Sequence, residues 1–343
     1  MLDQVLAVFG VKPETDLNLM EPGQELERIF TRALLAMKDE LAATRPDMVL
    51  VEGDTTTVFA TALAAFWRAC PVGHVEAGLR SGDVRNPFPE EMNRILAGAL
   101  ADLHFAPTRD AAENLRRCGV PDARIFVTGN TVIDALKSTA EKVRNLPRGV
   151  ALDPRARLVL VTVHRRESFG EPLRRVLTAL ARIVATIPDV ELALPVHPNP
   201  NVHRAVHAAL DRMPRVHLTP PLDYLEFVNY LQAAHLVLTD SGGVQEEAPA
   251  LGKPVLVLRE TTERPEGVNA GVAKLVGTAT ERIVGEATKL LADARAYRAM
   301  AYAVNPYGDG RASERIVEAL RFHFGMIPER PADFGAAAPA GGR

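Results

Sequence analysis

The sequence has very little cysteine and no long apolar run. Cys70 and Cys118 are the two cysteines in 343 residues, which excludes a disulfide framework, and no group of Cys and His has metal-ligand spacing. No apolar stretch is long enough to span a bilayer, and the first residues lack the charged and apolar regions of a signal peptide. We therefore expect a cytoplasmic protein with no metal ion and no membrane contact.

The sequence also lacks a basic block and the two common nucleotide-binding loops. The net charge is −3 and there is no basic block, which argues against a nucleic-acid partner. The chain contains neither Gly-x-Gly-x-x-Gly nor a Gly-Lys-Ser/Thr loop, so nicotinamide and P-loop readings lose support, and we expect no cofactor. The chain is 47% hydrophobic and 24% charged, as soluble globular proteins are, and its length suggests two domains.

Short apolar segments alternate with segments of helical spacing. Strands are expected at residues 47–54, 71–76, 103–106, 125–128, 158–163, 190–194, 216–218, 236–238, 254–258 and 274–276. This alternation predicts an α/β fold with parallel sheets, organised as two doubly wound Rossmann-like domains with a cleft between them. We place the domains at residues 1–145, of which the first 45 are mostly helical, and at 146–305. The tail at 328–343 is rich in Ala, Gly and Pro, which predicts disorder.

A tight turn joins one of these strands to a helix near the C-terminus. Ser241, Gly242 and Gly243 are small enough for backbone N–H groups to close on a ligand, and a helix N-terminus favours anions. Glu247 lies one turn into that helix, where a carboxylate could hold two ribose hydroxyls. The alternative interpretation is an ordinary strand-to-helix turn.

The loop after the strand at 158–163 carries His164, Arg165 and Arg166. One imidazole and two guanidinium groups suit a diphosphate, although a surface loop paired through Glu167 remains an alternative.

Three further residues on or near strand ends are candidates. His197 could orient a phosphate or be structural. Arg264 is a candidate nucleotide contact, and Phe227 could stack on a base or fill the core.

Three carboxylates gather on loops of the first domain: Asp54, Glu76 and Glu90. Asp54 and Glu76 end successive strands, so the fold should direct both into one crevice, whereas isolated loop carboxylates are usually only solvated. Paired acids can have their pKa values pushed apart, giving one acid and one base. Together with the second domain, they indicate proton chemistry on a nucleotide-linked substrate.

Eight motifs follow one another along the chain to about residue 325. They are Gly53-Asp54-Thr55-Thr56-Thr57, His74-Val75-Glu76-Ala77-Gly78-Leu79-Arg80, Pro89-Glu90-Glu91, Gly129-Asn130-Thr131-Val132-Ile133-Asp134, His164-Arg165-Arg166-Glu167-Ser168-Phe169-Gly170, Asp240-Ser241-Gly242-Gly243-Val244-Gln245-Glu246-Glu247, Thr262-Glu263-Arg264-Pro265-Glu266 and Asn305-Pro306-Tyr307-Gly308-Asp309-Gly310. In this order the chain closely resembles the non-hydrolysing UDP-N-acetylglucosamine 2-epimerase family.

The resemblance implies a fold like that of the B-type glycosyltransferases, in which residues 306–325 return to the first domain. It implies interconversion of UDP-N-acetylglucosamine and UDP-N-acetylmannosamine without nicotinamide, for cell-surface polysaccharide synthesis, by a homodimer. In bacterial members it also implies activation by UDP-N-acetylglucosamine at a neighbouring site, to which Gln24 could belong.

The family's roles carry over to individual positions of this chain. Asp54, Glu76 and Glu90 match the acid/base residues, and His164 matches a histidine near the phosphates. The nucleotide contacts match Ser241, Gly242 and Gly243 for the diphosphate, Glu247 for the ribose, and Arg264 and Phe227 elsewhere.

The chemistry fits these residues. Expelling UDP from C1 while a carboxylate takes the C2 proton gives a glycal, and UDP re-addition with protonation on the other face inverts C2. Which carboxylate is the base stays open. A hydrolysing epimerase, a non-catalytic UDP-sugar binder and, more weakly, a glycosyltransferase stay as alternatives.

The family begins with a strand and a Gly-Thr-Arg-Pro-Glu loop upstream of the position that matches Met1. That segment is missing here, and its loop would supply an arginine and a lysine to the active site. We hypothesise that the sequence starts at an internal methionine or is truncated, and that the chain as written is inactive.

Overall fold

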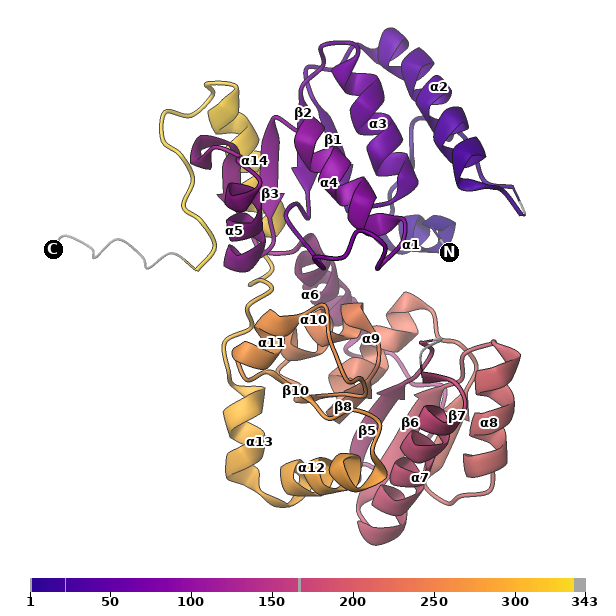
Figure 1. The fold of residues 1–343 in the computed structure, drawn as a ribbon. Coiled ribbons are helices and arrows are strands. Elements are labelled where there is room, and N and C mark those ends of the chain that lie inside the picture. The colour runs from indigo at the N-terminus through magenta and orange to yellow at the C-terminus, as the bar shows by residue number, and fades with distance from the viewer. Residues whose placement is uncertain (1, 22, 166–167, 336–343) are drawn as a thin grey trace, which may run out of the picture. The chain divides into compact units, whose positions relative to one another are not determined.

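The chain folds into two compact α/β units. The computed structural model describes residues 2–21, 23–165 and 168–335. Unit 1 comprises Met1–Asp134 and Gly310–Arg343, and unit 2 comprises Ala135–Asp309 (Figure 1). The first division falls within helix α6 (Thr131–Val143), ahead of the expected boundary at residue 145. Within the described residues, no helix combines the length and apolar character needed to cross a bilayer.

Unit 1 is built on a four-stranded parallel sheet in the order β1-β2-β3-β4. The strands are β1 (Val49–Glu52), β2 (Val72–Val75), β3 (Leu103–Ala106) and β4 (Ile125–Val127). The helices that precede and join them are α1 (Leu2–Phe9), α2 (Leu26–Thr44), α3 (Thr56–Phe66), α4 (Glu90–Leu100) and α5 (Arg109–Arg117), with a 3-10 turn at Asp122–Arg124. The described residues between 10 and 25, part of the segment expected to be mostly helical, contain no helix. Helix α1 ends at Phe9, and Gly10 follows it with a left-handed φ of 66°.

The two faces of this sheet have separate cores. Val51 and Val72 pack with α3 and α4 on one face. On the other face, Phe105 and Phe126 pack against Ile316 of α14 (Ala312–His323), so the C-terminal helix completes unit 1. Asp134 fixes the start of α14, since its carboxylate accepts from the backbone N–H groups of residues 312 and 313 at 3.0 and 2.8 Å.

The segment after α14 covers the β4 edge of the sheet. Val127 N donates to Asp333 Oδ1 at 3.0 Å, and Phe334 N donates to Val127 O at 2.7 Å. The guanidinium of Arg330 lies 4.0 Å from the centroid of the Phe126 ring. The expectation of disorder from residue 328 was therefore wrong for residues 328–335, because composition does not register these contacts; residues 336–343 lie outside the described part.

Unit 2 is built on a six-stranded parallel sheet in the order β10-β9-β8-β5-β6-β7. The strands are β5 (Arg157–Thr162), β6 (Val190–Pro195), β7 (Val216–Thr219), β8 (Ala234–Thr239), β9 (Val255–Val257) and β10 (Ala273–Leu275). The helices besides α6 are α7 (Glu171–Thr186), α8 (Pro200–Leu210), α9 (Tyr224–Ala233), α10 (Gly242–Ala250), α11 (Pro265–Asn269), α12 (Thr280–Ala292) and α13 (Ala294–Ala301).

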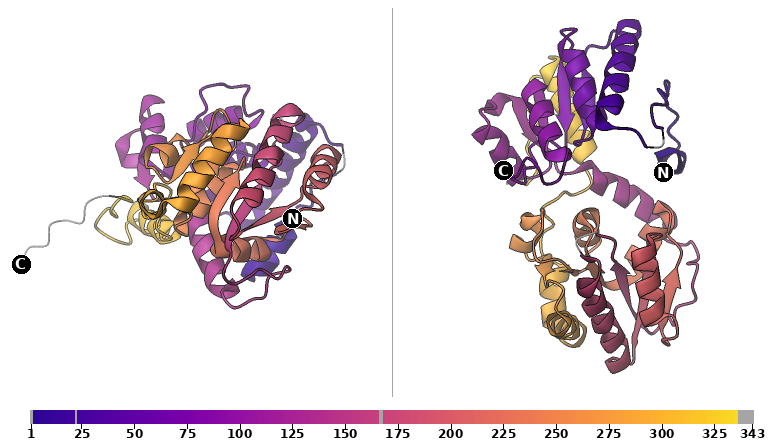
Figure 2. Two further views of the ribbon diagram at one scale, coloured as in Figure 1. Left: turned by 90° about the horizontal axis from the view of Figure 1, so that it is seen from below. Right: turned by 45° about the vertical axis from the view of Figure 1, so that its right-hand side comes forward.

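Helices cover both faces of this second sheet (Figure 2). Val159 and Val161 of β5 face the core formed with α7, α8 and α12, whereas Leu158 and Leu160 face the core formed with α6, α9 and α10. Because the strand order reverses between β5 and β8, a crevice is expected beyond their carboxyl ends. The α/β prediction of two Rossmann-like domains is confirmed.

We predict that Phe334→Ala lowers the free energy of unfolding by roughly 1–3 kcal/mol, because it removes a half-buried ring from the covered edge of β4. Urea unfolding would measure the change. Phe324→Ala is the matched control, since that ring is 44% exposed. Equal losses in the two variants would contradict a stabilising role for residues 328–335.

Candidate functional site

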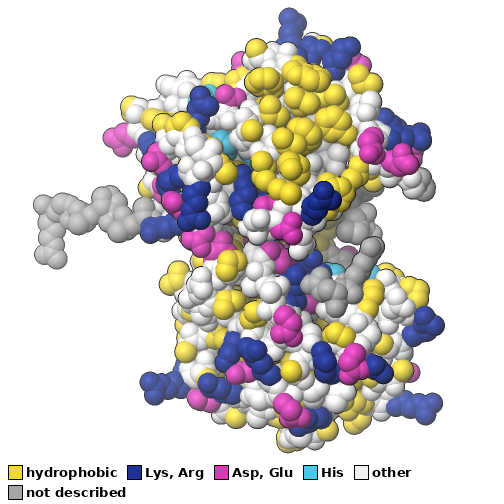
Figure 3. Space-filling view, in the orientation of Figure 1, with side chains coloured by type: hydrophobic (Ala, Val, Ile, Leu, Met, Phe, Trp, Pro, Cys, Tyr) yellow, Lys and Arg dark blue, Asp and Glu magenta, His cyan; other side chains and the backbone are white. Residues whose placement is uncertain are grey.

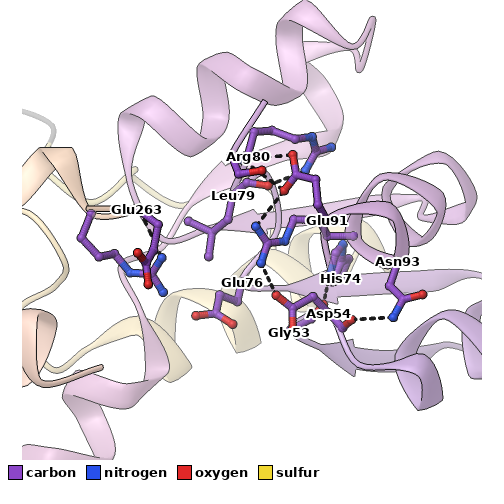
Figure 4. Close-up of polar contacts among 12 residues, drawn as sticks. Gly53, Asp54, His74, Glu76, Leu79, Arg80, Glu91, Asn93 and Glu263 are labelled. Atoms are coloured by element: carbon purple, nitrogen blue, oxygen red, sulfur yellow. Dashed lines mark hydrogen bonds and ion pairs between the residues drawn. The ribbon is translucent and has the colours of Figure 1, made fainter. Parts of the chain in front are cut away.

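Asp54 follows β1 and is held by residues of α4. Its carboxylate forms an ion pair with Arg94, and Asn93 Nδ2 donates to the backbone oxygen of Asp54 at 3.0 Å (Figure 4). The Asp54 side chain keeps 27% of its surface exposed. It is therefore both fixed in place and reachable by a ligand.

The adjacent glutamates on α4 have different environments. Glu91 is 1% exposed and accepts from the backbone N–H groups of Ser81 and Gly82 at 3.0 and 3.2 Å. It also accepts from Arg94 Nη1 at 2.9 Å. Glu91 thus anchors the loop after β2 and orients Arg94, whereas Glu90, in the first turn of α4, is half-buried.

Glu76 follows β2 in a left-handed backbone conformation, with φ of 60°. Its Oε1 accepts from Asn130 Nδ2 at 3.2 Å, and its Oε2 lies 3.4 Å from where a Cβ on Gly53 would be. Figure 4 shows its carboxylate beside the turn that carries Asp54. Non-glycine residues rarely adopt this φ, so the neighbouring structure imposes it.

A buried histidine supports the same turn. His74 is 1% exposed, and its Nε2 lies 2.8 Å from Gly53 O, so the ring donates to this carbonyl. Burial lowers the pKa of His74, which keeps the ring neutral. The ring fixes the backbone just before Asp54.

In unit 2, polar residues gather where β5 and β8 end. Asp240 follows β8, is fully buried, and accepts through Oδ2 from the N–H groups of His164 and Arg165 at 2.8 and 2.9 Å. Its Oδ1 lies 3.1 Å from His164 Nδ1. These hydrogen bonds fix the start of the loop after β5 to the end of β8. Arg166 and Glu167 lie outside the described residues.

Ser241 is the N-cap of α10, and Gly242 and Gly243 are its first residues. A Cβ on Gly242 would lie 3.0 Å from Glu263 Oε1, so a side chain at this position would have to displace that carboxylate slightly. Glu263 in turn accepts from Arg165 Nη2 at 3.0 Å and pairs with Arg259. Two guanidinium groups and a helix N-terminus thus converge on one carboxylate, in an arrangement that suits an anion.

Glu247 is 7% exposed and accepts from the hydroxyl of Tyr224 at 3.0 Å. The pKa of Glu247 is raised to about 7. Burial is the main cause, the hydrogen bond from Tyr224 opposes the rise, and the nearby charge of Glu246 adds to it.

The neighbouring Glu246 is 3% exposed and pairs with Arg264. The Tyr307 hydroxyl fixes the backbone at Arg264, because it donates to Arg264 O at 3.2 Å. Phe227 is half-buried and packs at the margin of the core between β8 and α9.

The sequence interpretation missed the residues that hold the expected side chains in place. They are His74, Glu91, Asn93, Arg94, Asn130, Tyr224 and Asp240. Several lie in the motifs quoted above, but their contacts span up to 76 positions of the chain. Within the described residues, no group of three His, Cys, Asp or Glu side chains could hold a metal ion.

These features define a class: a two-domain α/β protein of the B-type glycosyltransferase-like fold, with a helix N-terminus suited to an anion in one unit and strand-end carboxylates in the other. The chain belongs to the UDP-N-acetylglucosamine 2-epimerase family, whose model matches residues 1–321.

Named relatives are similar over most of their length. The chain is 53% identical over 332 residues to the UDP-N-acetylglucosamine 2-epimerase of Escherichia coli (strain K12), covering 94% of this chain and 88% of that protein. It is 52% identical over 336 residues to the Bacillus subtilis enzyme of the same name, covering 97% and 88%. The crystal structure of the Neisseria meningitidis UDP-GlcNAc 2-epimerase bound to UDP-GlcNAc superposes with a TM-score of 0.85 at 45% identity, covering 93% of this chain and 88% of that one.

We predict that Glu247→Gln raises the melting temperature at pH 8 and that this gain disappears near pH 5. Folding raises the pKa of this carboxyl from 4.5 to about 7, so the folded state binds the proton more tightly. The free energy of unfolding therefore falls by up to about 3 kcal/mol as pH rises through that interval. The glutamine variant has no carboxyl group to ionise and does not show this fall. Thermal unfolding between pH 4 and 9 would measure it.

Tyr224→Phe serves as the opposing variant, because it removes the hydrogen bond to the charged carboxylate. It should lower stability more at pH 8 than at pH 5. A pH-independent effect of Glu247→Gln would contradict the burial of a titrating carboxyl.

Proposed function

We propose that this protein interconverts UDP-N-acetylglucosamine and UDP-N-acetylmannosamine by the non-hydrolysing route. Membership of the family supports the substrate, and a relative of known structure is bound to UDP-GlcNAc. The observation that carries the proposal is the pair of carboxylates after adjacent parallel strands. Arg94 holds Asp54, and Asn130 holds Glu76.

The C2 proton of the sugar is not activated by a carbonyl, so direct removal is difficult. In the proposed reaction the bond between C1 and the diphosphate oxygen breaks, and UDP leaves with the electron pair. A carboxylate takes the C2 proton, and a C1–C2 double bond forms. UDP then adds back to C1 while a second acid protonates the opposite face of C2.

The reaction requires two proton transfers and the exclusion of water. Asp54, Glu76 and Glu90 are the acids available for the two proton transfers. Water must be excluded, because it would capture or release the glycal.

We assign binding of the nucleotide part of the substrate to unit 2. The N-terminus of α10, at Ser241, Gly242 and Gly243, and the His164 imidazole would hold the diphosphate. Glu247 would accept from the ribose hydroxyls, for which its charged form is required.

The remaining nucleotide contacts are Phe227 and Arg264. Phe227 would contact the base. Arg264 would reach the nucleotide from its present ion pair with Glu246.

We further propose cytoplasmic synthesis of a precursor for cell-surface polysaccharide, with activation by the substrate at a second site. Gln24 is a candidate for that site. In this structure its side-chain amide makes local hydrogen bonds: Oε1 accepts from Glu21 N and Nε2 donates to Leu19 O, both at 2.9 Å.

We predict that deuterium from heavy water enters C2 of UDP-N-acetylglucosamine while the manno epimer accumulates, as measured by an NMR time course. Asp54→Asn and Glu76→Gln should each slow exchange roughly 10²–10⁴-fold, because each removes a proton-transfer group. Glu318→Gln, on the exposed face of α14, is the control and should not change the rate.

Release of UDP with free N-acetylmannosamine would indicate the hydrolysing alternative. Absence of C2 exchange would overturn the epimerase proposal, and UDP binding without exchange would favour a UDP-sugar binder.

A homodimer is also proposed, through the apolar surface of unit 1. Large side chains of α2, α3 and α4 are exposed there: Leu35 by 55%, Phe66 by 59% and Leu96 by 36%, while Trp67 just beyond α3 is 66% exposed. Figure 3 shows apolar side chains gathered over α3 and α4. Contiguous apolar surface of this kind marks association sites, and a second copy is the partner that the family resemblance implies.

We predict that Trp67→Glu shifts the protein from dimer to monomer, because it places a charge in this apolar surface. Analytical ultracentrifugation would measure the mass. Val317→Glu is the matched control, on an α14 side chain that is 54% exposed. A monomeric parent protein would rule out the dimer.

A further inference from the structure

The loop after β9 lies against the first turn of α10. Residues 258–264 connect β9 to α11 and include Arg264, the N-cap of α11. Helix α10 begins at Gly242, after its N-cap Ser241. The side chain of Gln245, which is 1% exposed, links the two segments. It is a buried amide between two parts of the candidate nucleotide site.

The hydrogen bonds in this link have a fixed direction. Gln245 Nε2 donates to Ser241 O at 3.1 Å, and a carbonyl oxygen can only accept. Gln245 Oε1 therefore faces Thr262, whose hydroxyl donates to it at 2.6 Å. The Thr262 oxygen in turn accepts from Arg264 N at 3.1 Å. One chain of hydrogen bonds thus runs from the backbone of Arg264 to the N-cap of α10.

The other polar groups of Arg264 are also held. Its carbonyl accepts from the Tyr307 hydroxyl at 3.2 Å, and the Tyr307 oxygen accepts from Gly267 N at 2.9 Å. Its guanidinium forms the ion pair with Glu246 of α10. Because Thr262 accepts from the N–H, both backbone groups and the side chain of Arg264 have defined partners. The position of this arginine therefore depends on a small set of contacts that can be changed one at a time.

We propose that Gln245 is a positioning residue that fixes the loop carrying Arg264 against the first turn of α10, so that a nucleoside diphosphate meets an ordered site. The identity of this ligand rests on the proposed function, whereas the ordering of the loop does not. A loop that is already ordered spares binding the entropy cost of immobilising it. Without the amide, the loop becomes ordered only when the ligand binds, and the affinity falls.

Gln232 provides the comparison with an amide that only holds the fold together. Its Nε2 donates to Ala140 O at 2.8 Å and joins α9 to α6. Loss of that hydrogen bond should lower the melting temperature without changing the affinity for UDP. Gln245→Met and Gln232→Met are the same substitution, so they form a matched pair.

The first measurement is UDP affinity by titration calorimetry. Gln245→Met should weaken binding about tenfold, which corresponds to the loss of one hydrogen bond, and Gln232→Met should leave it unchanged. Thr262→Val removes the hydroxyl and should weaken binding to a similar extent, whereas Thr262→Ser keeps the hydroxyl and should bind UDP as the parent protein does. Unchanged affinity in Gln245→Met overturns the proposal. If that variant does not fold, unchanged affinity in Thr262→Val overturns it.

The double variant tests whether the two side chains act as one chain. Gln245→Met and Thr262→Val break the same link, so together they should weaken UDP binding no more than either does alone. Losses that simply add would overturn the single chain of hydrogen bonds.

The second measurement is hydrogen exchange at the Arg264 amide, which requires no ligand. Its N–H donates to Thr262, so exchange should become roughly tenfold faster or more in Gln245→Met and in Thr262→Val. Thr262→Ser and Gln232→Met should keep the protection of the parent protein. Unchanged protection in Gln245→Met overturns the fixing of the loop. Failure of the parent protein to bind UDP would instead count against the proposed function, and the exchange result would then decide whether Gln245 fixes the loop.

Discussion

Both faces of the central strands of the unit 2 sheet are buried, and the placement of the chemistry in that unit depends on this constraint. Along β5, Leu158 and Leu160 enter one core while Val159 and Val161 enter the other, so no position within the strand is free for a polar side chain. Polar residues that meet a ligand must come after the strand ends. His164 and Asp240 do so in unit 2.

The same fold buries several charged groups around these strand ends. Glu91, Asp240 and Glu246 are each no more than 3% exposed, and each is met by backbone N–H groups, an imidazole or an arginine. Removing such a group from water is costly, and its partners offset the cost only if the geometry is good. These carboxylates therefore hold loops and arginines at defined positions. Glu247 differs, because its partner is a neutral phenol, and burial dominates its pKa.

The sequence predicted the strands well because the information for them is local. A short apolar run between turn residues defines a buried parallel strand wherever the chain goes, and the fold class and the family were confirmed. The motifs also directed attention to residues that follow strand ends, and the roles assigned to individual side chains stay predictions.

What the sequence could not supply is the set of contacts between distant segments. Arg94 pairs with Asp54 across 40 positions, and composition cannot show that the segment containing Phe334 docks on β4. The division between the units lies inside α6, and a continuous helix gives no local sign in the sequence that its ends belong to different units.

Glu76 bears on any attempt to engineer this protein. Its left-handed φ costs of order 1–3 kcal/mol for a residue with a side chain, and glycine would adopt it freely. A redesign guided by thermostability alone would favour glycine there and would discard the carboxylate. Such a change would relax the backbone and at the same time remove the carboxylate that Asn130 holds beside the turn of Asp54.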